Sequence, residues 1–267
     1  MQPADRHITD SNFVLATPVG LPPNEVQLWR AEIDHLCAEE ARWQKVLSAE
    51  EKNRASRFHF PADRQRFAAS RALLRIILSG YLNLDPSTIA FAYSSKEKPS
   101  LAEPQMASGL TFNVSHSAGV ALFAFARERE IGVDIEQVRS TSDLDGIARR
   151  FFSAAEQRQF FAFPPDEKIR AFYRCWTRKE AYIKATGDGL SLPLSQFDVS
   201  LESGSKLGSS KHGSKNALLA TRPDPSAARQ WHLREVPAGP GFMAALCVRG
   251  VECAVRGWDE KPSEESF

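Results

Sequence analysis

One segment pattern occurs twice along the chain, and this internal similarity constrains the fold more than any other feature. The sequence LNLDPSTIAF at residues 82–91 resembles LSLPLSQFDV at residues 190–199, and each follows a stretch with helical periodicity and leads into a predicted strand. A second pair of segments, VALFAFA at residues 120–126 and FMAALCV at residues 242–248, is alike, and the first is apolar on both faces, as is typical of a strand inside a sheet. The repetition predicts two similar halves that meet near residue 130.

Hydrophobic periodicity places the other elements. It predicts strands at residues 26–33, 89–93, 110–115, 119–127 and 131–136, and helices at residues 38–58, 63–81, 144–152 and 166–185. Ser153 and Glu156 have the spacing of a capping box, which begins a helix. We therefore expect a mixed α/β fold with a lead-in at 1–25, an N-terminal subdomain at 26–130, a C-terminal subdomain at 131–257 and a flexible tail at 258–267. Residues 204–215, rich in Gly, Ser and Lys, predict a flexible loop.

Composition excludes several classes of protein. The 267 residues are 42% hydrophobic and 25% charged, which is typical of a soluble globular chain with a sizeable core. No run of eighteen apolar residues predicts a membrane span, and the polar first ten residues do not resemble a secretory signal. Four scattered cysteines without CxxC spacing indicate a reduced, cytoplasmic protein with no cysteine-based zinc site. The net charge of +1 predicts no nucleic-acid partner, although nine basic against three acidic residues at 42–75 indicate an anion-binding surface.

Three carboxylates are unusually placed. In the predicted strand IGVDIE, Asp134 and Glu136 share the face opposite the apolar residues, about 7 Å apart. Glu180 falls within the apolar stripe of its helix, where a carboxylate needs a compensating partner. A half-solvated strand and an Arg or Lys partner are the ordinary interpretations. The alternative is a metal held by all three acids, and an all-oxygen ligand set of this kind suits Mg²⁺.

Groups suited to phosphate surround these acids in the sequence. Lys179 and Lys184 flank Glu180, Lys96 and Lys98 lie in a loop before Pro99, and His116 follows a strand. A single histidine is more often a turn or core residue than a ligand. No GxxxxGK[ST], GxGxxG or HExxH motif is present, which removes the common nucleotide-loop and zinc-protease interpretations.

Two motifs resemble the signatures of the 4'-phosphopantetheinyl transferases, and most closely those of the large Sfp-type members. They are GVDIE at residues 132–136 and WTRKEAYIK at residues 176–184. Further similarities are FNVSHS at residues 112–117, RFFS at residues 150–153 before Glu156, and Arg57-Phe58 followed by Asp63 and Arg66. The resemblance extends over roughly residues 26–248 in the family's order.

The resemblance implies two α/β subdomains related by a pseudo-twofold axis in a monomeric chain. It implies transfer of 4'-phosphopantetheine from coenzyme A, with Mg²⁺, to a serine of an apo acyl or peptidyl carrier protein. The resemblance implies adenosine 3',5'-bisphosphate as the second product. It also implies carrier proteins of fatty acid biosynthesis or secondary metabolism. We expect no membrane partner.

The resemblance also assigns site residues. It implies metal ligands at Asp134, Glu136 and Glu180, with Glu180 or a metal-bound water as the base and Lys184 near the pyrophosphate. The remaining residues that it implies around the adenosine end of coenzyme A are Arg54, Arg66, Lys98, Ser115 and His116. Glu97 stands where relatives often have glycine, so the loop that carries Lys98 is expected to differ in shape.

Two other hypotheses remain open at this stage. The first is a magnesium-dependent hydrolase that cleaves coenzyme A or a nucleotide without a carrier protein. The second is a non-catalytic module that holds an acidic protein or nucleic acid on its basic stretch. Three acids at the centre of the site weigh against a simple anion-binding surface.

Overall fold

Strand β5 (Val120–Arg127) lies inside a sheet and contributes to two different cores. The computed structural model describes residues 20–37, 40–140, 143–203 and 216–259. Phe123 packs against the N-terminal helices, whereas Leu122 points into a core between two sheets. Strand β10 (Phe242–Arg249) divides in the same way, with Cys247 in a core with the C-terminal helices and Leu246 between the sheets. The predicted similarity of these two strands is confirmed.

The N-terminal half contains three strands of the main sheet, a separate two-stranded sheet formed by β2 and β3, and a layer of helices. Its strands are β1 (Glu25–Glu32), β2 (Phe91–Tyr93), β3 (Pro99–Leu101), β4 (Leu110–Ser117) and β5. Its helices are α1 (Ile33–Leu36), α2 (Glu40–Val46), α3 (Ala49–Ser56) and α4 (Pro61–Leu82), with short 3₁₀ turns at Pro86–Thr88 and Gln105–Ser108.

The C-terminal half repeats this plan. Its strands are β6 (Ile131–Gln137), β7 (Phe197–Val199), β8 (Leu218–Thr221), β9 (Trp231–Val236), β10 and β11 (Ala254–Asp259). Its helices are α5 (Leu144–Phe151), α6 (Ala154–Ala162) and α7 (Pro165–Thr186), with 3₁₀ turns at Gly189–Ser191, Leu194–Gln196 and Pro225–Gln230. In both halves a 22-residue helix leads through 3₁₀ turns into a short strand, which is the repeat seen in the sequence.

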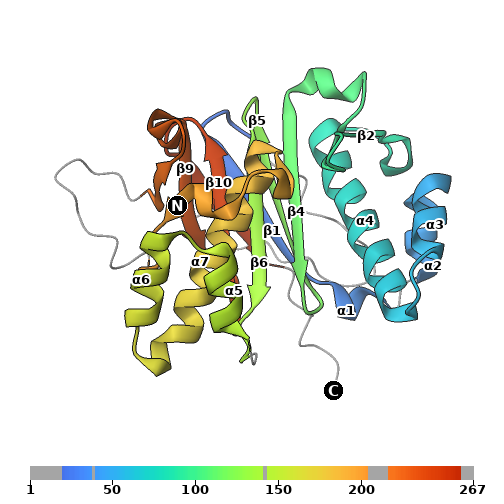
Figure 1. Cartoon of the computed structure of the whole chain (residues 1–267). Coiled ribbons are helices and arrows are strands. Elements are labelled where there is room, and N and C mark those ends of the chain that lie inside the picture. The colour runs from blue at the N-terminus through green and yellow to red at the C-terminus, as the bar shows by residue number, and fades with distance from the viewer. Residues whose placement is uncertain (1–19, 38–39, 141–142, 204–215, 260–267) are drawn as a thin grey trace, which may run out of the picture.

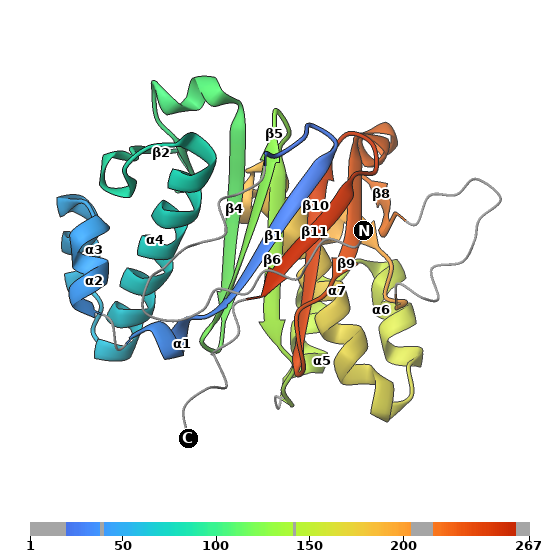
Figure 2. The same ribbon diagram turned by 180° about the vertical axis from the view of Figure 1, so that it is seen from behind.

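The two halves pack through the inner faces of their sheets. One sheet has the order β11-β1-β5-β4 and the other β6-β10-β9, and their facing side chains form a shared core. Helices α2 to α4 cover the outside of the first sheet and α5 to α7 the outside of the second, as Figures 1 and 2 show from opposite sides. Edge strands β4 and β6 lie side by side along the junction of the halves (Figure 1). None of the described helices is long and apolar enough to cross a membrane.

Several local expectations differ from the structure. The single helix expected at 38–58 is two helices, because Ser48 and Glu51 form a capping box that begins α3. Helix α4 ends at Leu82, one residue beyond the expected end, and Asn83, which adopts the left-handed conformation, caps it. Helix α7 begins at Pro165 and ends at Thr186, one residue beyond the expected bound at each end. Residues 1–19, the loop at 204–215 and residues 260–267 of the expected tail lie outside the described residues.

The last described strand was not predicted. Strand β11 runs parallel to β1 and pairs Ala254 with Glu25 and Asp259 with Arg30. The first two residues of the expected tail, 258 and 259, therefore form the end of a strand. Strand β11 thus completes the sheet of the N-terminal half, and it covers the edge of β1 that β5 leaves free.

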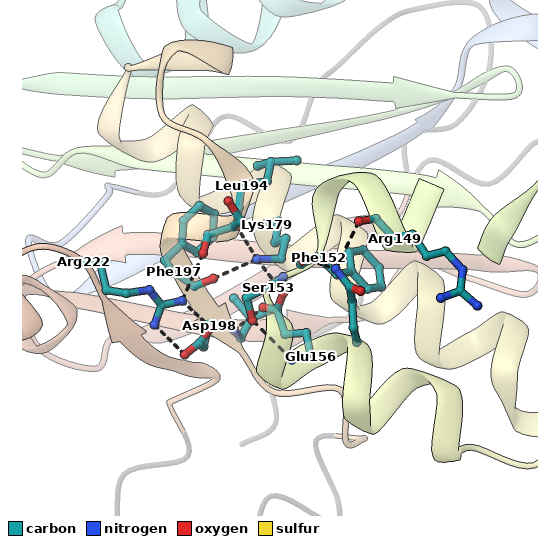
Figure 3. A network of polar contacts seen from close by, with 12 residues as sticks. Arg149, Phe152, Ser153, Glu156, Lys179, Leu194, Phe197, Asp198 and Arg222 are labelled. Atoms are coloured by element: carbon teal, nitrogen blue, oxygen red, sulfur yellow. Dashed lines mark hydrogen bonds and ion pairs between the residues drawn. The ribbon is translucent and has the colours of Figure 1, made fainter. Parts of the chain in front are cut away.

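In each half a buried ion pair joins a capping-box glutamate to a basic residue of the 22-residue helix. In the C-terminal half, the capping-box residue Glu156 pairs with Lys179 of α7 at 2.8 Å, and Lys179 also donates to the carbonyls of Leu194 and Phe197 (Figure 3). In the N-terminal half, the capping-box residue Glu51 pairs with Arg75 of α4 at 2.7 Å, and Arg75 donates to the carbonyls of Pro86 and Ile89. The expectation that Lys179 serves a phosphate is wrong, because its ammonium is fully buried in this pair.

Candidate functional site

The candidate site lies where β4 and β6 meet. Here hydrogen bonds from β6 amides to β4 side chains take the place of the backbone hydrogen bonds that usually join neighbouring strands. Asn113 Oδ1 accepts the amide of Val133 at 2.9 Å, and Ser115 Oγ accepts that of Ile135 at 3.3 Å. Ser117 Oγ accepts the next alternate amide of β6, that of Gln137, at 3.2 Å. We call these three contacts the seam. It joins the halves through one face of the FNVSHS motif.

Asp134 is held at the centre of the seam. Its Oδ1 accepts hydrogen bonds from Ser115 Oγ at 2.9 Å and from Lys184 Nζ at 2.7 Å. Its Oδ2 is buried and has no hydrogen-bond partner among the described residues. Burial raises the pKa of the Asp134 carboxyl, and the ammonium of Lys184 opposes that rise.

The two other acids lie near Asp134. Glu136 Oε2 accepts from Ser117 Oγ at 2.7 Å, while burial raises the pKa of its carboxyl. Glu180 is half-buried on α7 and makes no hydrogen bond or ion pair with the described residues. Burial, together with the charges of Asp134 and Glu136, raises the pKa of Glu180 to about 7. The cluster therefore carries more negative charge than its surroundings neutralise.

This donor set fits a hard divalent cation. It offers carboxylate oxygens only, one of them buried without a partner, and the Lys184 ammonium already lies on Asp134 as a positive charge. Among the described residues no three His, Cys, Asp or Glu side chains are arranged to hold a metal as they stand. Binding of a cation by all three acids would therefore require some of these side chains to move.

A cavity of about 510 Å³ opens beside the seam in the N-terminal half. His116 and Ser117 of β4 line it, together with Arg54, Arg66 and apolar residues of α4. Arg66 is engaged with Asp34 through two short contacts of 2.6 and 2.8 Å. Arg54 lies 3.7 Å from Glu97, and both of these side chains are largely exposed at the wall of the cavity.

Lys98 lies apart from the cavity wall. Its ammonium donates to the carbonyl oxygens of Ile131, Lys184 and Ala185, at the start of β6 and in the last turn of α7. A cation at this position complements the negative end of the helix dipole. Ser115 also differs from the expectation of a residue beside a phosphate, because it is buried and its hydroxyl contacts Asp134, Lys184 and the amide of Ile135.

Sequence reasoning missed three residues that shape the site. Asn113 and Ser117 belong to the FNVSHS motif, yet only their alternation with Ser115 shows that they share one strand face. Gly132 is needed for close packing, since a Cβ there would lie 2.2 Å from the Ala181 carbonyl oxygen of α7. This close approach brings α7, with Glu180, against β6.

Comparisons with known proteins agree with this geometry. Residues 130–239 match the family described as the 4'-phosphopantetheinyl transferase superfamily, and residues 19–128 match the 4'-phosphopantetheinyl transferase N-terminal family. The chain is 39% identical to the 4'-phosphopantetheinyl transferase HetI of Nostoc sp., over 90% of this chain and 94% of the relative. It is 32% identical to the 4'-phosphopantetheinyl transferase Sfp of Bacillus subtilis, over 78% and 85% of the two chains.

A solved structure, the holo-[acyl-carrier-protein] synthase of Thermotoga maritima, is 21% identical to the chain with a TM-score of 0.31. It covers 48% of this chain and 64% of that one. With both halves matched, the chain belongs to the 4'-phosphopantetheinyl transferase superfamily and is an Sfp-type transferase, which moves phosphopantetheine from coenzyme A to a carrier protein.

Proposed function

We propose that transfer takes place at the acid cluster of the seam, with Mg²⁺ held by Asp134, Glu136 and Glu180. The observation that carries this proposal is the unpartnered, buried Oδ2 of Asp134, whose carboxylate interacts with those of Glu136 and Glu180. Mg²⁺ bound there would neutralise charge on the pyrophosphate of coenzyme A during phosphoryl transfer.

The chain's own residues divide the remaining work. Lys184 supplies a positive charge on α7 next to Asp134, suited to a pyrophosphate oxygen. Glu180 accepts the proton of the attacking carrier serine, directly or through a water, because it is the acid that α7 adds to the pair on β6. Arg54, Arg66 and His116, which line the neighbouring cavity, surround the adenosine end of coenzyme A.

Two of the expected ligand contacts are proposed in altered form. Lys98 reaches coenzyme A only if its ammonium leaves the carbonyls at the end of α7. Ser115 supports the adenosine side indirectly, through the position of its neighbour His116 at the end of β4.

Other features of the reaction are part of the same proposal. We propose a cytoplasmic monomer, with subdomains at 26–130 and 131–257, that acts without a membrane or nucleic-acid partner. Its carrier proteins belong to fatty acid biosynthesis or secondary metabolism. Two internal halves in one chain support the monomer, because the site lies between β4 and β6 of the same molecule.

A mass assay tests the proposal. Purified apo carriers of the fatty acid, polyketide and nonribosomal peptide types are incubated with the protein, coenzyme A and Mg²⁺. At least one carrier is expected to gain the mass of phosphopantetheine, and chelation of the metal is expected to stop the reaction. Glu180→Gln is expected to lose transfer while keeping the wild-type melting temperature or a higher one. No gain on any carrier, or release of bisphosphate without a carrier, would contradict the proposal.

A further inference from the structure

The two serines of the seam contact both strands and acids in a repeated arrangement. Ser115 Oγ accepts the Ile135 amide and donates to the carboxylate of Asp134, the residue before that amide. Ser117 Oγ accepts the Gln137 amide and donates to the carboxylate of Glu136. Each hydroxyl therefore binds one amide of β6 and the acid that directly precedes it.

This arrangement fixes the direction of the serine proton. A hydroxyl has a single proton, and an amide N–H can only donate. With the Gln137 amide pointing at Oγ, the proton of Ser117 is left for Glu136 Oε2, 2.7 Å away. The hydroxyl, the amide and the carboxylate thus close a ring that selects one orientation of the Glu136 side chain.

Glu136 depends on this contact more than Asp134 depends on Ser115. Asp134 is also held by Lys184 at 2.7 Å, whereas the Ser117 hydroxyl is the sole hydrogen-bond donor to Glu136 within the described parts of the chain. Glu136 is half-buried, so solvent can reach its carboxylate and other rotamers are open to it. A side chain of this kind needs a neighbour to hold it in a ligating position.

We propose that Ser117 is a positioning residue, which orients the Glu136 carboxylate toward the cation cluster and does not itself contact the cation. This inference rests on the proposed metal site. It assigns to Ser117 a role beyond joining the halves. A residue that only joins them needs no more than a contact with a β6 amide, such as the one between Asn113 and Val133.

Asn113 provides a matched control. It accepts a hydrogen bond from a β6 amide at 2.9 Å, as Ser117 does at 3.2 Å, and its side chain makes no hydrogen bond to a carboxylate of the described residues. Ser117→Ala and Asn113→Ala each remove one seam contact, but only Ser117→Ala also removes the hydrogen bond to the Glu136 carboxylate. Ser117→Thr keeps the hydroxyl.

The experiment measures Mn²⁺ binding to the full chain by calorimetry, without coenzyme A, and the urea denaturation of each variant. Ser117→Ala is expected to weaken Mn²⁺ binding by about tenfold, while Asn113→Ala and Ser117→Thr stay within about twofold of wild type. If Ser117→Ala does not fold, Ser117→Cys, with its weak donor, replaces it.

Three outcomes would overturn the inference, and they are distinguishable. Equal losses of Mn²⁺ affinity in Ser117→Ala and Asn113→Ala would show that Ser117 acts only through the seam. A loss in Ser117→Thr as large as in Ser117→Ala would show that the effect does not come from the hydroxyl. A wild-type chain that binds no Mn²⁺ would overturn the proposed metal site and this inference together.

Discussion

Replacing Lys179 with methionine tests the buried ion pair of the C-terminal half. The Lys179 side chain is 0% exposed and that of Glu156 is 2% exposed, so neither can turn to solvent. Methionine keeps most of the aliphatic volume but removes the ammonium, which leaves Glu156 charged and two carbonyls without this donor. Removing one partner of a buried pair costs about 3–5 kcal/mol.

This magnitude corresponds to a large thermal shift. For domains of this size, 1 kcal/mol lowers the melting temperature by roughly 2–4 °C, so Lys179→Met is expected to melt on the order of 6–20 °C below wild type. Burial raises the pKa of Glu156, and losing the cation would raise it further. A raised carboxyl pKa gives stability that is lost as pH rises, so the deficit is expected to be smaller at pH 5 than at pH 8.

Two further variants separate the charge effect from packing. The double variant Glu156→Gln/Lys179→Met leaves no buried charge and is expected to be more stable than Lys179→Met alone. Arg75→Met in the other half is expected to cost less, because Glu51 keeps a second cation, Arg71, at 3.5 Å. The reasoning is refuted if Lys179→Met melts within about 2 °C of wild type, or if the double variant is less stable than the single one.

Three other predictions concern the site. Because the pKa of Glu180 is raised to about 7, the charge on its carboxylate destabilises the metal-free fold as pH rises toward 8. Mg²⁺ should therefore raise the melting temperature more at pH 8 than at pH 6. Glu180→Gln should abolish that difference. Glu97 has a φ of 59° and lies 3.7 Å from Arg54, so Glu97→Gly should tighten coenzyme A binding in calorimetry by about two- to fivefold without loss of stability; weaker binding would contradict this. Gly132→Ala places a Cβ against the backbone of α7 and should cost about 3 kcal/mol or more in urea unfolding together with loss of transfer, whereas wild-type stability would disprove the close packing.

The two-half architecture and the acid cluster could be predicted from sequence because each leaves a local pattern. Residues 120–126 are apolar at every position, and this requires burial on both faces. Asp134 and Glu136 alternate with Val133 and Ile135, which places the acids on one face of β6. Patterns of this kind depend only on strand geometry.

The partners of the lysines could not be predicted in the same way. Lys98 and Lys179 donate mainly to backbone carbonyls, and a carbonyl leaves no trace in the sequence. The break before α3 did have a signal, because Ser48 and Glu51 repeat the spacing of Ser153 and Glu156. Strand β11 is short and pairs with a strand at the opposite end of the chain, so no local pattern indicates its partner.

The pairing of β11 with β1 also affects the folding of the chain during its synthesis. Strand β1 leaves the ribosome well before its outer partner β11, which comes last among the described elements. Roughly 200 residues separate them, which corresponds to on the order of 10–40 s of synthesis during which that edge of β1 has no strand beside it. An open edge of this kind invites pairing with other chains. The nascent protein is therefore vulnerable to aggregation until β11 emerges, and a chain that stops short of β11 carries that exposed edge permanently.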